Sequence, residues 1–538
     1  MLESTRPDFD PVRLEIFKHR FASIAEEMGV VLRKASYSPN IKERRDFSCA
    51  IFDPLGKMIS QAAHIPVHLG SMPLSVSSAI QKFTPEGIHP GDVLMLNDPY
   101  HGGTHLPDIT LISPVFIDDS GEKSVNVGFV ASRAHHADVG GATPGSMAIS
   151  REIYQEGIIL PPVKLIEEGH LNAGIFDIFL ANVRTPEERQ GDLWAQIAAN
   201  QRGETRLKEI TKRYGLPELH RYARALMDYS ERMTRRLLNS LPDGTFAFTD
   251  YLDDDGIHDE PVKIMVRIKI QGEQAEVDFS GSSPQVAGSL NAVYAIALSA
   301  VNYVFRCLVS LDVPNNSGCL APIKVIAPEG TITNALPPAP VAGGNVETSQ
   351  RIVDALFGAL SQACPDRIPA ASQGTMNNVT MGGYNPENGA AFTYYETVGG
   401  GVGARPNSDG PSAMHSHMTN TLNTPCEALE YAYPLTVMRY EIRRGSGGEG
   451  YFKGGDGIRR DIRVDVPAQL SLITERRSTS PFGLNGGLPG EKGSNVLIRN
   501  GEEIQLPGKG TISLIPGDVL SVRTPGGGGF GRPELSGE

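Results

Sequence analysis

Apolar residues recur with helical spacing in two long stretches of the chain. Across residues 11–34 they return at three- and four-residue steps, which is the pattern of an amphipathic helix with one buried face. The same spacing spans residues 186–241, where Pro186 in "TPEER" marks a capped helix start and Pro217 divides the stretch into two helices. A third, buried helix is predicted for the apolar run that begins at Ala292.

Short apolar runs predict strands in much of the remaining chain. Between residues 45 and 163 such runs are separated by Gly, Pro, Asp and His, as in strands joined by functional loops. Apolar and polar residues then alternate around Gln271-Gly272, which predicts a hairpin. From residue 369 onward, glycine-rich loops alternate with strand-like runs, and the main helix signal is "CEALEYAY".

These patterns predict a mixed α/β (α+β) fold with several subdomains. The chain has 538 residues, whereas single cores rarely grow beyond about 250–300 residues. We place an N-terminal α/β region at residues 1–242, a central α+β module with the hairpin and buried helix at 243–368, and a β-rich, glycine-rich region at 369–538.

Composition and charge argue against several classes of protein. The net charge is −13 without a stripe of Lys and Arg, which disfavours nucleic acid as a partner. Asn302 and Arg306 interrupt the longest apolar stretch, which falls short of the roughly 20 apolar residues of a membrane span. The first residues lack the basic start and apolar run of a signal peptide, and five scattered cysteines form no CxxC pair. We therefore expect a cytoplasmic protein without membrane contact.

The familiar nucleotide-binding and hydrolase motifs are missing from the sequence. It contains no GxxxxGK[ST], HExxH or GxSxG motif. One GxGxxG does occur at residues 445–450, but "YFKGGDG" follows it where a dinucleotide site requires an apolar helix. A nucleotide site of a familiar kind is therefore not predicted.

Histidine and aspartate cluster in one part of the chain. Seven of the 13 histidines lie in residues 64–136, and the spacing His-x-x-Asp occurs twice, at His105–Asp108 and at His135–Asp138. Both copies are flanked by glycine pairs, which either allow close approach of the backbone to a ligand or simply turn the chain. Imidazole and carboxylate together suit zinc, manganese or iron(II). The alternative is that these are hydrogen-bonding loop residues.

Two further histidine pairs are weaker candidates. "HIPVH" places His64 and His68 four residues apart, but Pro66 disfavours a regular helix there, so we expect a loop lining the site. "MHSHMTNTLN" holds His415 and His417, which would share a face of an extended segment and either contact substrate or belong to a polar strand.

Long and unusual strings run through nearly the whole chain: "ERRDFSCAIFD", "HLGSMP", "LNDPYHGGTHLPDITLISPVF", "ASRAHHADVGGATPGSM", "PEERQGDLWAQIAAN", "DFSGSSPQVAGSLNA", "GGNVETSQRIVD", "SPFGLNGGLPG" and "TPGGGGFG". In these strings the sequence resembles the hydantoinase B/5-oxoprolinase family. The resemblance implies the beta-type subunit of an ATP-dependent enzyme whose partner, similar to hydantoinase A, holds the nucleotide. Relatives open cyclic amides such as hydantoins, 5-oxoproline and lactams, and related acetone and acetophenone carboxylases act on ketones.

The resemblance also implies a set of metal ligands. Its His-x-x-Asp falls on His105 and Asp108, and its upstream aspartate falls on Asp46. Its downstream histidine falls on either His135 or His136, which are adjacent. Of that pair we choose His135 as the ligand, which keeps the spacing to Asp138. The implied set holds two imidazoles and two carboxylates and leaves one position open.

We predict that His136 and Asp138 act in catalysis, as a general base or by orienting water. Contacts to substrate or to the ligands are expected for a larger set: His64, His68, Asp98, His101, Asn345, Glu347 and Gln350. For the last three, turn and cap chemistry is the alternative. The implied function is metal-dependent ring opening of a cyclic amide after ATP-dependent phosphorylation in a hydantoinase A-like partner, within a hetero-tetramer. A ketone carboxylase subunit, a non-catalytic scaffold and a metal hydrolase that works alone are the alternatives.

Overall fold

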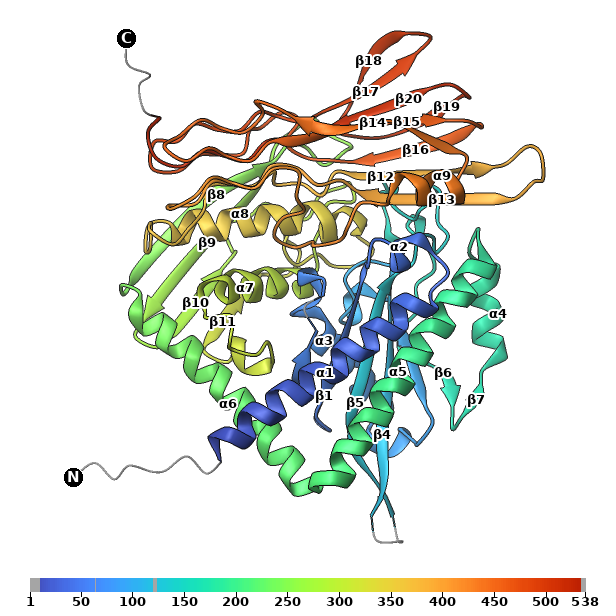
Figure 1. Cartoon of the computed structure of the whole chain (residues 1–538), viewed down its shortest axis with the longest axis vertical. Coiled ribbons are helices and arrows are strands. Elements are labelled where there is room, and N and C mark those ends of the chain that lie inside the picture. Colours follow the sequence, from blue (N-terminus) through green and yellow to red (C-terminus); the bar gives the residue numbers. More distant parts are fainter. Residues whose placement is uncertain (1–9, 63, 120–122, 534–538) are drawn as a thin grey trace.

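The computed structural model describes residues 10–62, 64–119 and 123–533, and it confirms a mixed α/β fold with a β-rich C-terminal region (Figure 1). Its described strands form four sheets of seven, four, four and five strands. The predicted boundaries near residues 242 and 368 stay a prediction. Among the described residues, no helix is both long and apolar enough to cross a membrane.

The long amphipathic helices form where the apolar spacing predicts them. α1 spans Pro11–Ala35 and is capped by Asp10, whose side chain accepts from the Val12 N–H. α5 (Pro186–Tyr214) and α6 (Leu216–Ser240) are separated at Gly215, which has a φ of +85°. Pro217 therefore lies in the first turn of α6, where a missing N–H costs nothing. The predicted cap of α5 is wrong in one detail, because Thr185 makes no side-chain cap hydrogen bond.

A seven-stranded sheet fills the N-terminal part, in the order β2-β1-β5-β4-β3-β6-β7. Side chains of β1 alternate, so that Phe47, Cys49 and Ile51 pack with α1 and α5 while Ala50 and Phe52 pack with α3. The elements are β1 Phe47–Phe52, β2 Met58–Gln61, α3 Ser71–Phe83, β3 Val93–Leu96, β4 Asp108–Asp119, β5 Lys123–His135, β6 Val163–Glu167, β7 His170–Leu171, the short α2 Pro39–Lys42 and α4 Ala173–Ala181.

The middle part of the chain forms a four-stranded sheet and two buried helices, with the sheet at the left side of the molecule in Figure 1. Its elements are β8 Gly244–Leu252, β9 Val262–Gln271, β10 Gln274–Asp278, β11 Ile323–Ile326, α7 Tyr294–Leu308, a π-helical turn η6 at Gly344–Thr348, and α8 Ser349–Leu360. The predicted hairpin is present, and its two-residue loop is Gly272-Glu273, one position later than the sequence centre suggests. The predicted buried helix is α7.

The C-terminal strands form two sheets that lie above α7 and α8 in Figure 1 (orange to red). One sheet contains β12 Asn378–Tyr384, β13 Ala391–Thr397, β16 Ala468–Ile473 and β19 Lys509–Leu514; the other contains β14 Leu435–Arg443, β15 Gly457–Val464, β17 Ser494–Arg499, β18 Glu502–Leu506 and β20 Val519–Arg523, with α9 at Cys426–Ala432. Glycine is needed in the tail because a Cβ at Gly527 would lie 2.1 Å from the Val402 carbonyl oxygen.

Candidate metal centre

Strands β4 and β5 bring two of the predicted metal ligands together. Asp108 is the first residue of β4, His135 is the last residue of β5, and the two are direct partners in the antiparallel register. His105 precedes β4 in a turn, where its carbonyl accepts from the Asp108 N–H at 3.1 Å. The turn and the strand pair therefore place three predicted ligands at one end of the sheet.

The side chains of His105, Asp108 and His135 are buried and converge, and we call them the triad. His105 Nε2 lies 3.3 Å from Asp108 Oδ1 and 3.2 Å from His135 Nδ1, while His135 Nδ1 lies 3.4 Å from Asp108 Oδ1. Ligand atoms at about 2.0–2.2 Å from a tetrahedral zinc are roughly 3.3–3.6 Å apart. The triad therefore has the spacing of metal ligands and could hold a divalent ion.

Neighbouring groups orient both imidazoles of the triad. His105 Nδ1 lies 3.3 Å from the Ala342 carbonyl oxygen, an arrangement that puts the proton on Nδ1 and leaves the lone pair of Nε2 toward the triad. The His135 ring stacks on Tyr395 with centroids 4.3 Å apart and planes 11° apart. These contacts hold the two nitrogens toward Asp108 before any ion binds.

The second oxygen of Asp108 is also held. Asp108 Oδ2 accepts from Thr104 Oγ1 at 2.5 Å and lies 3.3 Å from His68 Nε2. His68 Nδ1 in turn lies 2.8 Å from Ser48 Oγ. His68 thus contacts the triad directly, as its place in the predicted lining loop suggests.

Burial and mutual charge set the protonation of this group. Burial disfavours the Asp108 carboxylate, but the charges of His105 and His68 outweigh it and hold the Asp108 pKa well below its usual range. Burial also opposes charge on His105, yet the charge and hydrogen bond of Asp108 raise the His105 pKa. Burial lowers the pKa of His135 and of His68. The carboxylate is therefore anionic, and a dication that binds here would displace any proton that Asp108 favours on His105.

Asp46, the fourth predicted ligand, lines the same cavity but lies outside the triad. It is buried, with Arg44 Nη1 3.8 Å from its Oδ2, and burial raises its pKa. Among the described residues, only the triad atoms fall within 4.8 Å of one another as a potential ligand group. Ligation by Asp46 stays a prediction.

The cavity at the triad is small. Asp46, His68, Asp108, His135 and Asn345 line a space of about 20 Å³, and a single water needs roughly 10–15 Å³. The cavity therefore accepts an ion or a water molecule, whereas a cyclic amide requires the walls to move.

Asn345 reaches the triad from the π-helical turn η6, a type of turn that is frequent at functional sites. Its Nδ2 lies 3.0 Å from His105 Nε2, and its buried Oδ1 has no hydrogen-bond partner among the described residues. Rotating the amide by half a turn would direct Oδ1 at the triad, which makes Asn345 a polar group available to an ion or a substrate.

His136 and Asp138 lie outside this group. Because side chains alternate along a strand, His136 faces the opposite side from His135, and its Nε2 lies 2.9 Å from Gln196 Oε1 on α5. The Asp138 carboxylate accepts from Arg184 Nη1 at 2.8 Å and from three backbone N–H groups. Their catalytic role stays a prediction that no contact in the structure supports.

The other predicted contact residues also lie away from the triad atoms. His64 Nδ1 accepts from the Cys49 N–H, and Asp98 caps a short turn and pairs with the exposed His101 at 2.7 Å. The Glu347 carboxylate accepts from the Met376 N–H and from Asn378 Nδ2. Gln350 donates to the Ser416 carbonyl, His415 is half-buried, and His417 Nε2 lies 3.6 Å from Asp354 Oδ1.

Thr104 and Tyr395 contact the triad and were not predicted. Thr104 directly precedes His105, so the neighbourhood of the motif was its only sequence signal. Tyr395 comes from β13, 260 positions beyond His135, and nothing local marks it. Only the pairing of distant segments reveals its role.

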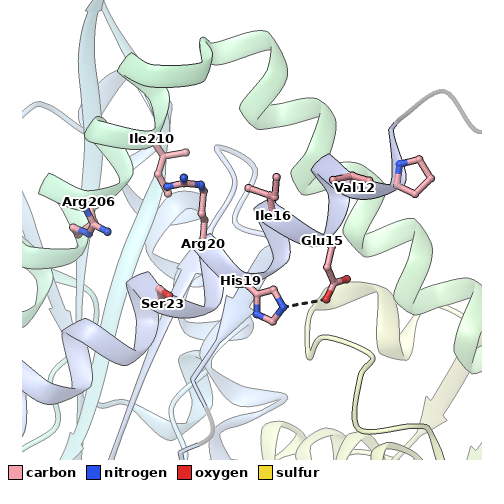
Figure 2. A pocket seen from close by; sticks show the side chains of 9 residues that line it. Val12, Glu15, Ile16, His19, Arg20, Ser23, Arg206 and Ile210 are labelled. Carbon is pink, nitrogen blue, oxygen red and sulfur yellow. Dashed lines mark ion pairs between the residues drawn. The ribbon is translucent and has the colours of Figure 1, made fainter.

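A larger surface groove lies along α1 and is not the candidate site. It has a volume of about 710 Å³, and Val12, Glu15, Ile16 and His19 are among its lining residues (Figure 2). Its ion pair, between His19 Nε2 and Glu15 Oε1 at 3.0 Å, is exposed, and such pairs contribute only about 0–1 kcal/mol. None of the predicted site residues lines this groove.

Fold and site together describe a mixed α/β protein with a buried group of two histidines and one aspartate that could hold a metal ion. The chain belongs to the hydantoinase B/oxoprolinase family, which matches residues 10–533.

Three known proteins illustrate this relationship. The chain is 42% identical to 5-oxoprolinase 1 of Arabidopsis thaliana over 97% of its own length, but it spans only 42% of that protein. It is 34% identical to the putative B-type subunit of a D-/L-hydantoinase from a Pseudomonas species, with 97% and 90% of the two chains covered. The crystal structure of an ATP-dependent caprolactamase from Pseudomonas jessenii superposes with a TM-score of 0.91 at 30% identity, covering 98% of this chain and 93% of that one.

Proposed function

We propose that this chain is the metal-dependent hydrolytic subunit of an ATP-dependent cyclic amide hydrolase. The observation that carries the proposal is the buried triad, whose three ligand atoms have metal-like spacing in a family that includes oxoprolinases and hydantoinases. A solved structure with the same fold, 30% identical to this chain, is that of an ATP-dependent caprolactamase. Hydantoins, 5-oxoproline and lactams are the proposed substrate class.

The proposed division of labour places ATP in a second chain. This chain spans 42% of the Arabidopsis oxoprolinase but 90% of the Pseudomonas hydantoinase subunit, so relatives exist both as long chains and as separate subunits. We assign ATP use to a hydantoinase A-like partner, which phosphorylates the amide carbonyl oxygen. The pair assembles twice in a hetero-tetramer, and no phosphate-binding loop is needed in this chain.

The chemical problem is that an amide carbon is poorly electrophilic and its nitrogen leaves poorly. Phosphorylation answers the first difficulty, and net hydrolysis then consumes one water for the ring and one for ATP, giving the ring-opened acid, ADP and phosphate. A zinc, manganese or iron(II) ion in the triad would supply a water of lowered pKa, toward about 7. His105, Asp108 and His135 would hold it, with Asp46 as the fourth ligand.

Residues around the triad have proposed roles that follow from their contacts. His68 is placed to take or return a proton, because its Nε2 faces Asp108 and its Nδ1 faces the Ser48 hydroxyl. Asn345 is placed to orient the substrate or the water. Asp138, occupied by Arg184, holds the following loop in place.

Ring opening should depend on the triad while phosphorylation of the substrate does not. His105→Ala and Asp108→Ala proteins, mixed with the partner, are expected to lose bound metal and ring opening and to keep ATP-dependent phosphorylation. His101→Ala is the matched control, because it removes an exposed histidine from the same loop. Full ring opening in either triad variant would overturn the proposal.

The alternatives separate in the same reconstituted system. A panel of hydantoins, 5-oxoproline, lactams and ketones with bicarbonate distinguishes amide hydrolysis from ketone carboxylation. A non-catalytic scaffold predicts that the triad variants are fully active. A hydrolase that works alone predicts ring opening, or ATP hydrolysis, by the isolated chain, which our proposal excludes.

A further inference from the structure

A second pocket lies directly behind one wall of the triad cavity. This outer pocket has a volume of about 290 Å³ and opens to solvent beside α1; Arg33, Arg45, His64, Asn420 and Leu422 are among its lining residues. Small-molecule sites begin at roughly 300 Å³. The outer pocket is thus large enough for a small ligand, whereas the triad cavity, at about 20 Å³, is not.

The wall between the two spaces is one layer of chain. Three segments contribute neighbouring residues to opposite sides of it, one residue lining the outer pocket and the next lining the triad cavity: Arg45 and Asp46, His64 and Ile65, Asn420 and Thr419. The two residues of each pair are consecutive in the sequence, so only their shared backbone separates the two sides. A ligand in the outer pocket is therefore separated from the triad cavity by a single backbone thickness.

Contacts on both sides hold the wall in place. Arg44 Nη2 lies 2.6 Å from Thr397 Oγ1, and the His64 ring packs edge-on against Phe47. Asn420 Nδ2 donates to the His64 carbonyl oxygen at 3.2 Å, and the Leu422 N–H donates to the Arg44 carbonyl oxygen at 3.0 Å. Arg45 has a φ of +58°, a left-handed conformation that is costly for a residue with a side chain and that clusters at functional sites. That turn sends Arg45 outward while Asp46 faces inward.

The outer pocket carries two arginines, Arg33 and Arg45, that have no hydrogen-bond or ion-pair partner among the described residues. One carboxylate, Glu26, also lines the pocket. His64 adds no charge at neutral pH, because burial lowers its pKa to about 4. Guanidinium groups suit a phosphate, because each can bind it through two parallel hydrogen bonds.

We propose that the outer pocket admits the phosphorylated substrate and that Arg33 and Arg45 bind its phosphate group. This inference rests on the proposed function, in which an anionic intermediate must pass from the partner to the triad. The arginines hold the intermediate against the wall, and the three wall segments must move apart, with loss of the bond from Asn420 to the His64 carbonyl, to open the route.

Binding of a probe to the isolated full chain tests the pocket without the reaction. Methyl phosphate is the probe, acetate is the carboxylate comparison, and calorimetric titration measures the dissociation constants. We expect Arg33→Ala/Arg45→Ala to weaken methyl phosphate binding at least tenfold, and the matched control Lys34→Ala, which removes one charge from the same helix end, to change it less than twofold. Unchanged binding in the double variant overturns the proposal, and acetate binding as tight as that of methyl phosphate overturns the assignment to phosphate.

Coupling in the reconstituted complex tests the route. The double variant should keep its metal content and its melting temperature while ring-opened product per ATP consumed falls at least tenfold; an unchanged ratio overturns the proposal. Failure of the proposed function is a different result, because the wild-type complex would then open no ring on any substrate while the titration still reports on the pocket.

Discussion

The two His-x-x-Asp segments share one spacing and differ in how they meet the strands. In the first, His105 stands in a turn and Asp108 begins β4, so both side chains enter the triad. In the second, His135 ends β5 and only the histidine reaches the triad. Asp138 lies beyond the strand, where Arg184 and the backbone N–H groups of the following glycine loop hold it.

The difference shows that a spacing has meaning only relative to a strand boundary. A turn brings residues i and i+3 together, as the hydrogen bond from the Asp108 N–H to the His105 carbonyl shows. A strand end followed by an irregular loop separates them. The second copy therefore supplies one ligand, His135, and one residue that anchors a loop, Asp138. Loss of the Asp138 contacts should lower the free energy of unfolding.

The largest expected effect is at the first segment. Asp108→Ala removes the carboxylate that faces both histidines of the triad, so bound metal should be lost. Removing a supporting residue alone costs about 10–100-fold in metal affinity or activity, so we expect ring opening to fall by more than about 100-fold. Metal analysis of the purified protein and ATP-dependent turnover with the partner measure the two effects.

The corresponding change in the second segment is the control for this experiment. The folded fraction of Asp138→Ala should keep its bound metal. If Asp138→Ala loses the metal and Asp108→Ala keeps it, the roles of the two segments are reversed.

A buried carboxylate links the two segments, and its titration is the next largest effect. The Glu156 carboxylate accepts from the Val341 and Ala342 N–H groups, and the carbonyl of the same Ala342 orients His105 in the first segment. The backbone of Glu156 also packs against Gly141, which follows the second segment. Burial raises the Glu156 pKa from 4.5 to about 7, against the hydrogen bonds from Ser150 and the backbone. A raised carboxyl pKa makes the folded state bind more protons than the unfolded state between these pH values.

Stability should therefore fall as pH rises from 4.5 to about 7 and level off above that. The pKa change corresponds to about 3 kcal/mol. In Glu156→Gln this contribution disappears, so the stability difference between wild type and variant should change by about that amount across the interval. Urea denaturation at pH 5 and pH 8 measures it; parallel pH profiles for the two proteins would refute this role of Glu156.

Much of the candidate site was predictable because its residues are local in sequence. The repeated His-x-x-Asp spacing marked the region, the family resemblance implied His105, Asp108 and His135 as ligands, and all three meet in the triad. The choice between His135 and His136 follows from strand alternation, since one end of β5 directs His135 to the triad and His136 to α5. Asn345, Ala342 and Tyr395 come from segments more than 200 positions away; Asn345 was predicted as a contact residue, whereas the contacts of Ala342 and Tyr395 depend on how the sheets pack.

The fold was predictable where one face of an element is polar. α1, α5 and α6 lie on the surface, and their apolar spacing predicts them well. α8 was not predicted. All of its residues are buried, and its polar residues Arg351 and Asp354 meet buried ionic partners instead of solvent. α3, with a mixture of serine and apolar residues, was missed for lack of a clear boundary.

A smaller effect is expected for the loop anchor itself. Asp138→Asn keeps the shape of the side chain but replaces one acceptor oxygen with an NH₂ group. That group then faces N–H donors, such as the Gly145 N–H, from which the carboxylate accepts hydrogen bonds. Unsatisfied buried groups of this kind cost about 1–3 kcal/mol. Thermal unfolding should show the loss while metal content stays at the wild-type level; a variant as stable as wild type would show that the Arg184 contact does not anchor the loop.

The smallest effect distinguishes the two adjacent histidines. His136→Asn removes the contact between Nε2 and Gln196, and one hydrogen bond contributes about 0.5–1.5 kcal/mol. Metal affinity should stay within about twofold of wild type, whereas His135→Asn, one residue earlier, should lower it by more than about tenfold because it removes a ligand. Competition with a chelating dye measures both affinities. Equal losses in the two variants would mean that His136 also serves the metal, and the alternation along β5 would not separate the roles of the pair.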